Sequence, residues 1–214
     1  MRKVMIGIVL SLAGAAQADE VVIAALGDSL TQGYGLPVEQ GFVPQLQAWL
    51  TSQGADVRLI NAGVSGDTTA GGRARVDWTL TPDVDGMIVA LGGNDVLRGL
   101  PPEQARSNLS GILQTAQTAD VEVLLIGMQA PGNYGADYKT DFEAIYPDLA
   151  EEYHSLYLNS FFAGLSAGGE PVDPNALRDL FQADGIHPNA AGVKKVVARI
   201  GPEVLALIEK ITQG

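Results

Sequence analysis

The chain has 214 residues, of which 46% are hydrophobic and 18% are charged, which is the composition of a globular protein and excludes a disordered one. Acidic residues outnumber basic residues by 25 to 13, which disfavours nucleic acids and anionic membrane surfaces as partners because an acidic surface repels phosphate groups. The chain contains no cysteine, which excludes a thiol nucleophile and any thiolate metal site.

The first 18 residues have the pattern of a cleaved secretory signal peptide. Arg2 and Lys3 give a positive start, an apolar segment begins at Val4, and Ala16-Gln17-Ala18 is typical of a cleavage site. A first strand or an anchoring helix is disfavoured, because the apolar segment is too short to span a bilayer and a separate strand follows it. We therefore expect an exported bacterial protein, periplasmic or secreted, with no stable membrane insertion after cleavage.

Residues 19–214 form the expected mature protein. Loss of Arg2 and Lys3 leaves 11 basic against 25 acidic residues, so the net charge becomes −14. No linker-like change of composition interrupts this segment, and its length suits a single domain with a buried core. We expect this domain to be a monomer.

Apolar segments of strand length alternate with amphipathic segments along the whole chain. Strands are expected at Val21–Leu26, Val57–Asn61, Met87–Leu91, Val121–Met128 and Leu156–Leu158. Helices are expected at Phe42–Gln53, Thr68–Leu80, Pro102–Ala119, Asp137–Tyr153, Pro174–Phe181 and from about Asn189, the last one interrupted or kinked at Gly201-Pro202. This alternation predicts an α/β fold with a parallel sheet and helices on both faces, whose sites form at the carboxyl ends of the strands.

Ser29 follows the first expected strand in the sequence Gly27-Asp28-Ser29-Leu30, and a polar, glycine-rich segment comes after it. Gly27 permits a tight turn at this point. A serine hydroxyl is a weak nucleophile until a base removes its proton, so a catalytic role for Ser29 requires a histidine nearby. The alternative is that Asp28 or Ser29 merely caps a short helix.

Two further polar segments follow the second and third expected strands. In the segment Asn61-Ala62-Gly63-Val64-Ser65-Gly66-Asp67, Gly63 can bring a backbone N–H close to a ligand, although an ordinary left-handed turn explains this glycine equally well. In Gly92-Gly93-Asn94-Asp95, Asn94 can present a side-chain N–H, whereas Asp95 could cap the next segment. Two such donors and the N–H of Ser29 would form an oxyanion hole.

His187 is one of two histidines in the chain and lies three residues after Asp184. A carboxylate at this spacing, in a turn fixed by Gly185 and Pro188, can hold the imidazole in the useful tautomer and stabilise the imidazolium. A structural histidine is the alternative, but it leaves the other polar segments at strand ends unexplained. The combination of Ser29 with His187 therefore predicts a serine acyl hydrolase.

Taken together, these segments resemble the SGNH (GDSL) hydrolases, and most closely the bacterial periplasmic thioesterase I/lysophospholipase L1/arylesterase group. The resemblance covers nearly all of residues 19–214. It is carried by four blocks in order: Gly27-Asp28-Ser29-Leu30, Asn61-Ala62-Gly63, Gly92-Gly93-Asn94-Asp95 and Asp184 to Asn189. The resemblance implies a flavodoxin-like three-layer αβα sandwich with a mostly five-stranded parallel sheet, and it implies neither a cofactor nor a metal.

The resemblance also implies the roles of the site residues. Ser29 would be the nucleophile, His187 the base and then the acid, and Asp184 the residue that orients the imidazole. Ser29 N–H, Gly63 N–H and the Asn94 side chain would form the oxyanion hole, and Asp28 would support the site.

The implied substrates are small-molecule carboxylic esters and thioesters, cleaved through an acyl-Ser29 intermediate. A carbohydrate O-deacetylase of the same fold remains an alternative, and a non-catalytic acyl- or glycan-binding module is another. We expect loops near Trp78 to Val84 and Asn133 to Asp141 to set the shape of the acyl pocket.

Overall fold

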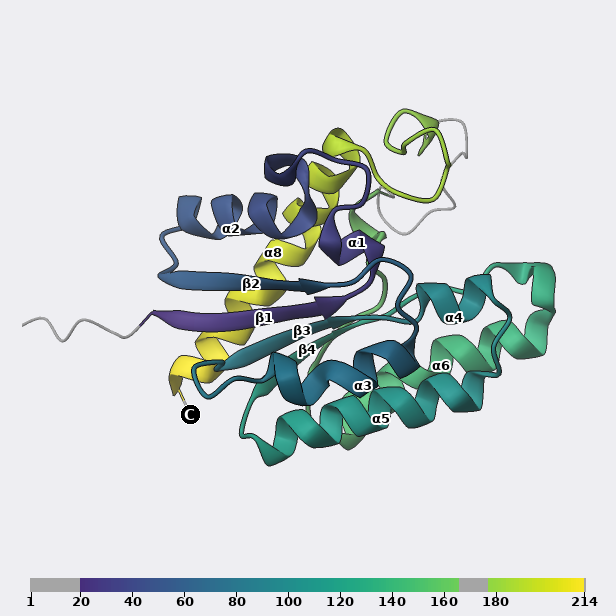
Figure 1. Ribbon diagram of the computed structural model, residues 1–214, viewed down its shortest axis with the longest axis horizontal. Helices are drawn as coiled ribbons and strands as arrows, with labels where there is room; N and C mark the ends of the chain where they lie inside the picture. Colours follow the sequence, from purple (N-terminus) through teal and green to yellow (C-terminus); the bar gives the residue numbers. More distant parts are fainter. Residues whose placement is uncertain (1–19, 166–176, 214) are drawn as a thin grey trace, which may run out of the picture.

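The computed structural model describes residues 20–165 and 177–213, which contain a five-stranded parallel sheet of order β2-β1-β3-β4-β5 (Figure 1). The strands are β1 (Val21–Gly27), β2 (Val57–Gly63), β3 (Gly86–Ala90), β4 (Glu122–Ile126) and β5 (Leu156–Leu158). All five expected strands are confirmed, with ends that differ by no more than two residues from those predicted. The segment predicted to be a signal peptide lies outside the described residues.

Helices cover both faces of the sheet, as the α/β prediction requires (Figure 1). One face carries α2 (Phe42–Ser52) and α8 (Ala190–Gln213). The other carries α3 (Thr69–Thr79), α5 (Pro102–Thr118) and α6 (Ala136–Glu152). Of the helix predicted at Pro174–Phe181, Leu177 and Arg178 are helical and the first three residues lie outside the described part.

Two short helices that the sequence pattern did not predict follow directly after strands. These are α1 (Ser29–Gln32), after β1, and α4 (Gly93–Leu97), after β3. Three 3-10 turns complete the described elements: Val38–Gln40, Gly132–Tyr134 and Ala163–Leu165.

The two central strands are buried at every position, because helices cover both of their faces. Each residue of β1 and of β3 is buried, which explains why these segments are continuous apolar runs with no alternation. In the parallel register, Gly27 at the end of β1 lies beside Gly63 of β2 and Ala90 of β3. The loops that carry the predicted site residues therefore begin at one common edge of the sheet.

The last helix, α8, is continuous from Ala190 to Gln213, so the interruption expected at Gly201-Pro202 is wrong. Gly201 lies against Trp49 of α2, and a Cβ atom at this position would be 2.4 Å from the indole ring. This close packing of two apolar helix faces stabilises the helix across Pro202, which cannot donate a backbone hydrogen bond.

Both ends of the described chain lie at the amino edge of the sheet, opposite the loops that carry the site residues (Figure 1). The central strand β1 starts at that edge, and α8 runs back to it from the carboxyl edge. Ile211, near the end of α8, packs so closely on Gly86 at the start of β3 that a Cβ there would be 2.7 Å from Ile211 Cδ1.

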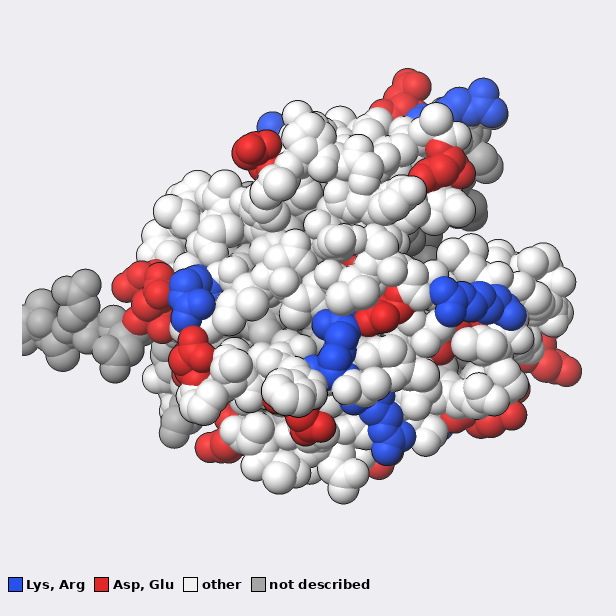
Figure 2. Space-filling view, in the orientation of Figure 1, with Lys and Arg blue, Asp and Glu red and all other residues white. Residues whose placement is uncertain are grey.

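Charged side chains are scattered over the surface. On the face seen in Figure 2, acidic and basic side chains are interspersed, and most of the visible surface is uncharged. No helix in residues 20–165 and 177–213 is long and apolar enough to cross a membrane.

A buried tyrosine holds the loop after β3. Tyr146 of α6 is 1% exposed, and its hydroxyl donates a hydrogen bond of 2.9 Å to the carbonyl oxygen of Leu91. Gly92, with φ of +118°, follows Leu91, and a Cβ atom there would be 2.1 Å from the tyrosine oxygen. The glycine thus lets the chain turn at the carboxyl end of β3 while the hydroxyl fixes the position of the loop.

We expect Tyr146→Phe to lower the free energy of unfolding by about 1–3 kcal/mol, because it leaves a buried carbonyl without a partner. Tyr153→Phe is the matched control, since it removes a hydroxyl that contacts Ser110 Oγ at 2.7 Å in a partly exposed place where water can replace it. Urea unfolding measures the change in the free energy of unfolding for both variants, provided that their m-values equal that of the wild type. An equal loss in the two variants would contradict the role assigned to Tyr146.

Candidate active site

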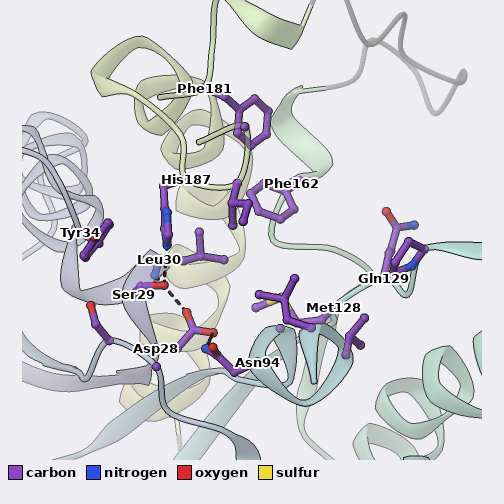
Figure 3. A pocket seen from close by; sticks show the side chains of 18 of the residues that line it. Asp28, Ser29, Leu30, Tyr34, Asn94, Met128, Gln129, Phe162, Phe181 and His187 are labelled. Carbon is purple, nitrogen blue, oxygen red and sulfur yellow. Dashed lines mark hydrogen bonds between the residues drawn. The ribbon is translucent and has the colours of Figure 1, made fainter. Parts of the chain in front are cut away.

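The structure brings Ser29 and His187 together from opposite ends of the described chain (Figure 3). Ser29 is the first residue of α1, and its Oγ lies 2.8 Å from Nε2 of His187. The two residues are 158 positions apart in the sequence. The hydroxyl therefore lies within hydrogen-bonding distance of a base, which is the geometry that an activated serine nucleophile requires.

Asp184 binds the other side of the imidazole. Its Oδ2 lies 2.7 Å from His187 Nδ1, while its Oδ1 accepts hydrogen bonds from the backbone N–H groups of Ile186 and His187 at 2.9 Å and 3.0 Å. These contacts, the backbone N–H of His187 first among them, lower the pKa of Asp184 to about 2. The carboxylate therefore remains charged while it faces the imidazole, and it can stabilise the protonated ring.

Asp28 caps α1 and also lines the pocket, so a helix cap and a place in the site are not exclusive alternatives for this segment. Its Oδ1 accepts the N–H of Leu30 at 3.0 Å, and its Oδ2 accepts the side-chain N–H of Asn94 at 3.2 Å (Figure 3). The side chain is buried, and burial raises the pKa of Asp28 to about 6 in spite of these hydrogen bonds.

Asn94 and its neighbour Asp95 face different partners. Asn94, in α4, lines the pocket beside Ser29, with its amide held by Asp28. Asp95 is 1% exposed and accepts hydrogen bonds from the N–H and the hydroxyl of Thr69 at 2.8 Å and 2.6 Å. Asp95 thus binds the first N–H of α3, whose N-cap residue is Thr68. The prediction that Asp95 caps the segment after it is therefore wrong.

The structure corrects the expectation for Gly63, which does not line the pocket. Its N–H donates to Asn61 Oδ1 at 2.9 Å. Its φ is not positive, so the alternative of a left-handed turn is also wrong. The glycine is needed because α1 packs directly on it: a Cβ atom would lie 2.3 Å from the backbone nitrogen of Gln32.

Gly66, three residues after the end of β2, is the glycine that reaches the pocket. It has φ of +84°, and among the described residues its N–H donates to no protein acceptor. Gly66 belongs to the polar segment that was predicted after the second strand, but Gly63 was expected to be the donor because the strand was predicted to end at Asn61, whereas β2 extends through Gly63 itself. The signal was the Ser65-Gly66-Asp67 turn, which begins only where the strand has ended.

Arg75 of α3 joins the ends of β1 and β2 just below these loops. Its guanidinium donates to the carbonyl oxygens of Gly27 and Ala62 at 2.8 Å and 2.7 Å and pairs with Asp67 at 2.7 Å. The Gly27 carbonyl also accepts the N–H of Val64 at 3.0 Å, so the guanidinium is a second donor to that oxygen and joins the ends of the two strands. No sequence motif pointed to this arginine.

A cavity of about 720 Å³ opens beside Ser29. Its walls are mainly apolar, and no lysine or arginine of the described residues lines it. The apolar side chains that form it are Leu30, Val96, Leu97, Met128, Pro131, Phe162, Phe181 and Ile186. Such a pocket can hold a hydrocarbon chain next to the serine hydroxyl.

Only one of the two loop segments expected to shape the pocket does so. Asn133 and Tyr134 line it, whereas no residue of the segment from Trp78 to Val84 does. The reason is topological, because residues 80–85 connect the end of α3 to the amino end of β3, at the edge of the sheet opposite the pocket.

No group of three or more histidine, aspartate or glutamate side chains that could hold a metal ion occurs within the described ranges. The site joins the Ser29 hydroxyl, the His187 imidazole and the Asp184 carboxylate by hydrogen bonds. This is the set that acyl transfer to a serine uses.

Comparison with known proteins gives the same kind of chemistry. The model of the GDSL-like lipase/acylhydrolase family matches residues 25–195. The esterase TesA of Pseudomonas aeruginosa is 36% identical over 193 residues, which cover 90% of this chain and 92% of that protein. Thioesterase 1/protease 1/lysophospholipase L1 of Escherichia coli K12 is 38% identical over 176 residues, which cover 82% of this chain and 78% of that protein.

Solved structures agree with these relatives. The crystal structure of TesA superposes with a TM-score of 0.77 at 36% identity, covering 87% of this chain and 99% of that one. AlinE4, an esterase of the SGNH-hydrolase family, is 43% identical, with a TM-score of 0.71 and coverage of 89% and 98%. The sequence match, the shared fold and the serine–histidine pair at the carboxyl edge lead to one conclusion: this chain belongs to the GDSL-like lipase/acylhydrolase, or SGNH hydrolase, family.

Proposed function

We propose that this protein is a serine acyl hydrolase that cleaves carboxylic esters and thioesters through an acyl-Ser29 intermediate. One observation carries the proposal. Ser29 Oγ, His187 and Asp184 are joined by hydrogen bonds, and Ser29 lines a mainly apolar cavity. A binding module has no need for a nucleophile within reach of a base. Relatives named as an esterase, an arylesterase and a thioesterase/lysophospholipase support the same activity.

In the proposed acylation step, Oγ of Ser29 attacks the carbonyl carbon of the substrate while His187 Nε2 takes the hydroxyl proton. The imidazolium that forms is stabilised by the ionised Asp184 on its other nitrogen. The tetrahedral intermediate collapses when His187 gives this proton to the leaving alcohol or thiol, and the acyl group stays on Ser29. In deacylation, His187 takes a proton from a water molecule while the water oxygen attacks the acyl carbon. The imidazolium then returns this proton to Ser29 Oγ as the bond between Oγ and the acyl carbon breaks and the acid leaves.

The negative charge on the tetrahedral oxygen needs donors that are already in place. We assign this role to the N–H of Ser29, the side-chain N–H of Asn94 and, in place of Gly63, the N–H of Gly66. Asn94 and Gly66 both line the cavity, and Asp28 supports the site by holding the amide of Asn94. The loss of one such donor typically costs about 10²–10³ in turnover.

The cavity favours a substrate with a hydrocarbon acyl chain. A polysaccharide ester, the substrate of a carbohydrate O-deacetylase, would present mostly hydroxyl groups to walls that are largely apolar. The acidic surface and the lack of lysine or arginine at the cavity fit neutral small molecules better than nucleic acids. The protein acts as a monomer without cofactor in this proposal.

Export completes the proposal. Removal of residues 1–18 as a signal peptide would leave residues 19–214 as a single hydrolase domain outside the cytoplasm. This part of the proposal rests on the charged start, apolar centre and alanine-rich cleavage pattern of the sequence.

Ser29→Ala should abolish hydrolysis of p-nitrophenyl esters, with a loss of kcat of at least about 10³–10⁴-fold, because no other group can form the acyl intermediate. A fluorophosphonate probe should label the wild type and not this variant. Ser52→Ala, an exposed serine at the end of α2, is the control and should keep full activity. Substantial turnover by the Ser29→Ala variant would refute the assignment.

The ionised Asp184 should be needed for turnover across neutral pH. Because the pKa of Asp184 is about 2, its carboxylate stays charged throughout the range from pH 5 to 8 and can stabilise the imidazolium of His187 there. Asp184→Asn should therefore lower kcat by about 10²–10⁴-fold at every pH in this range, because the imidazolium loses its stabilising charge. Initial rates of p-nitrophenyl ester hydrolysis at several pH values measure this loss. A variant that keeps the wild-type kcat would exclude Asp184 as the group that stabilises the ring.

The buried Asp28 should lower stability at neutral pH. Its pKa is about 6 in the folded protein against a usual value of 3.8, so the folded state binds the proton more tightly than the unfolded chain. The free energy of unfolding should therefore fall as the pH rises from about 4 to about 6 and stay low above that. Asp28→Asn should be more stable than the wild type at pH 8 by about 1–3 kcal/mol, and this difference should shrink below pH 4.

Urea unfolding of both proteins at several pH values tests this expectation. Asp83→Asn is a control of opposite sign, because hydrogen bonds from Thr81 and Arg58 lower the pKa of that exposed carboxyl. Its charged form contributes stability above the usual carboxyl pKa, so the variant should be slightly less stable at pH 8. An Asp28→Asn variant that is less stable than the wild type at pH 8 would show that burial does not dominate at this site.

A further inference from the structure

We propose that Gln182 is a positioning residue that fixes the loop carrying His187 against the loop that follows Ser29. The inference rests on the proposed function, because it concerns the alignment of the same nucleophile and base. Gln182 is not one of the residues that the sequence pattern singled out, and it does not line the cavity beside Ser29.

The side-chain amide of Gln182 bridges two backbone carbonyl groups. Its Nε2 donates to the carbonyl oxygen of Tyr34 at 2.8 Å and to that of Pro188 at 3.0 Å. An amide nitrogen has two hydrogens, so both are used. Tyr34 follows α1, which begins with Ser29, and Pro188 follows His187. One half-buried amide thus joins segments that are 148 residues apart.

The approach of the two segments is so close that it requires a glycine. Gly35 has φ of +74°, and a Cβ atom there would lie 2.2 Å from Oε1 of Gln182. The bridge also controls an aromatic contact, since the ring of Tyr34 lies 4.7 Å from the imidazole of His187 at a tilt of 40°. The segment that Gln182 holds is therefore the one whose side chain packs on the proposed base.

The other hydrogen bonds of the His187 loop are internal to it. The backbone N–H of Gln182 donates to the carbonyl of His187 at 2.8 Å, and that of Gly185 donates to the carbonyl of Gln182 at 3.0 Å. In the part of the chain that the structure describes, the hydrogen bonds from this loop to the Ser29 segment are those of Gln182 Nε2 and His187 Nε2.

Apart from His187 itself, Gln182 is thus the residue of this loop whose side chain hydrogen-bonds to the Ser29 segment in the part of the chain described. Without the Gln182 bridge, the internal bonds can persist while the whole loop shifts relative to α1. Such a shift would lengthen the distance between Ser29 Oγ and His187 Nε2. It would also move Phe181 and Ile186, which form one wall of the cavity, while the walls from other segments stay in place. A displacement of about 1 Å in reacting groups can cost about 10²-fold in rate.

The test is Gln182→Met, which keeps the length of the side chain and removes both N–H donors. We expect kcat for p-nitrophenyl butyrate to fall by about 10–100-fold, while KM changes by a smaller factor because only one wall of the cavity belongs to this loop. The rate of Ser29 labelling by a fluorophosphonate should fall by the same factor as kcat, because that reaction needs the same base but no acyl pocket. A purely structural role would not lower these two rates by the same factor in the folded protein.

Gln45→Met is the matched control. The Nε2 of Gln45 also bridges two carbonyl oxygens, those of Gln40 at 2.7 Å and of Ala190 at 3.3 Å, but it contacts neither Ser29 nor His187. This variant should lose stability to a similar extent and keep its kcat. Equal losses of kcat in the two variants, or an unchanged kcat in Gln182→Met, would overturn the proposal.

Gln182→Glu decides the matter if the methionine variant does not fold. It has the same shape, but its carboxylate faces two carbonyl oxygens and donates no hydrogen bond, so kcat and the rate of fluorophosphonate labelling should again fall together. Failure of both variants to fold would mean that Gln182 is required for folding and not for alignment, which also refutes the proposal. If the wild type itself shows no Ser29-dependent turnover, the proposed function fails. If the wild type turns over normally and Gln182→Met is fully active, only the role of Gln182 is refuted and the proposed function stands.

Discussion

The hydrogen bond between Ser29 Oγ and His187 Nε2 is the interaction on which the site depends. It joins two loops whose positions are set by different parts of the molecule. Ser29 is placed by β1, the buried strand beside β2 and β3, while His187 is placed by the start of α8. The sheet and α8 must therefore keep a fixed relation for the hydroxyl to meet the imidazole. The packing of α8 on α2, including the contact of Gly201 with Trp49, maintains that relation.

Around this hydrogen bond, polar side chains bind the ends of the strands and so leave the reactive groups free. Arg75 binds the last carbonyl groups of β1 and β2, Asp95 binds the first N–H of α3, and Tyr146 holds the loop after β3. Each of these groups has its partners in the protein, which is the usual state of buried polar atoms. Asp28 differs, because its carboxyl is buried with a raised pKa at the point where it orients Asn94. In the proposed reaction, this buried carboxyl fixes the side chain of Asn94, which is assigned as a donor to the tetrahedral oxygen.

The sequence predicted the sheet well because its strands are buried on both faces and read as apolar runs of unmistakable length. Ser29, Asn94, Asp184 and His187 were predicted because each follows a strand or lies in a short polar motif. The structure brings these residues together, and their roles in the reaction stay predictions. The prediction that Gly63 faces the pocket was wrong for a geometric reason. Strand β2 continues through the polar Asn61 to Gly63, and the end of that strand decides which glycine faces the pocket. Local patterns also predicted a break at Pro202, where packing between helices distant in sequence determines the outcome. Gln182 could not have been found, since its importance arises from a contact across 148 residues.

The described part of the chain begins and ends on the side of the molecule away from the cavity. β1 enters at the amino edge of the sheet and α8 returns there, whereas Ser29 and His187 lie at the carboxyl edge (Figure 1). An affinity tag, a fused domain or a tether to a solid support can therefore be joined at the carboxyl terminus with the mouth of the cavity directed into solution. Attachment in this orientation presents every immobilised molecule to substrate in the same way, which random coupling through surface lysines does not achieve.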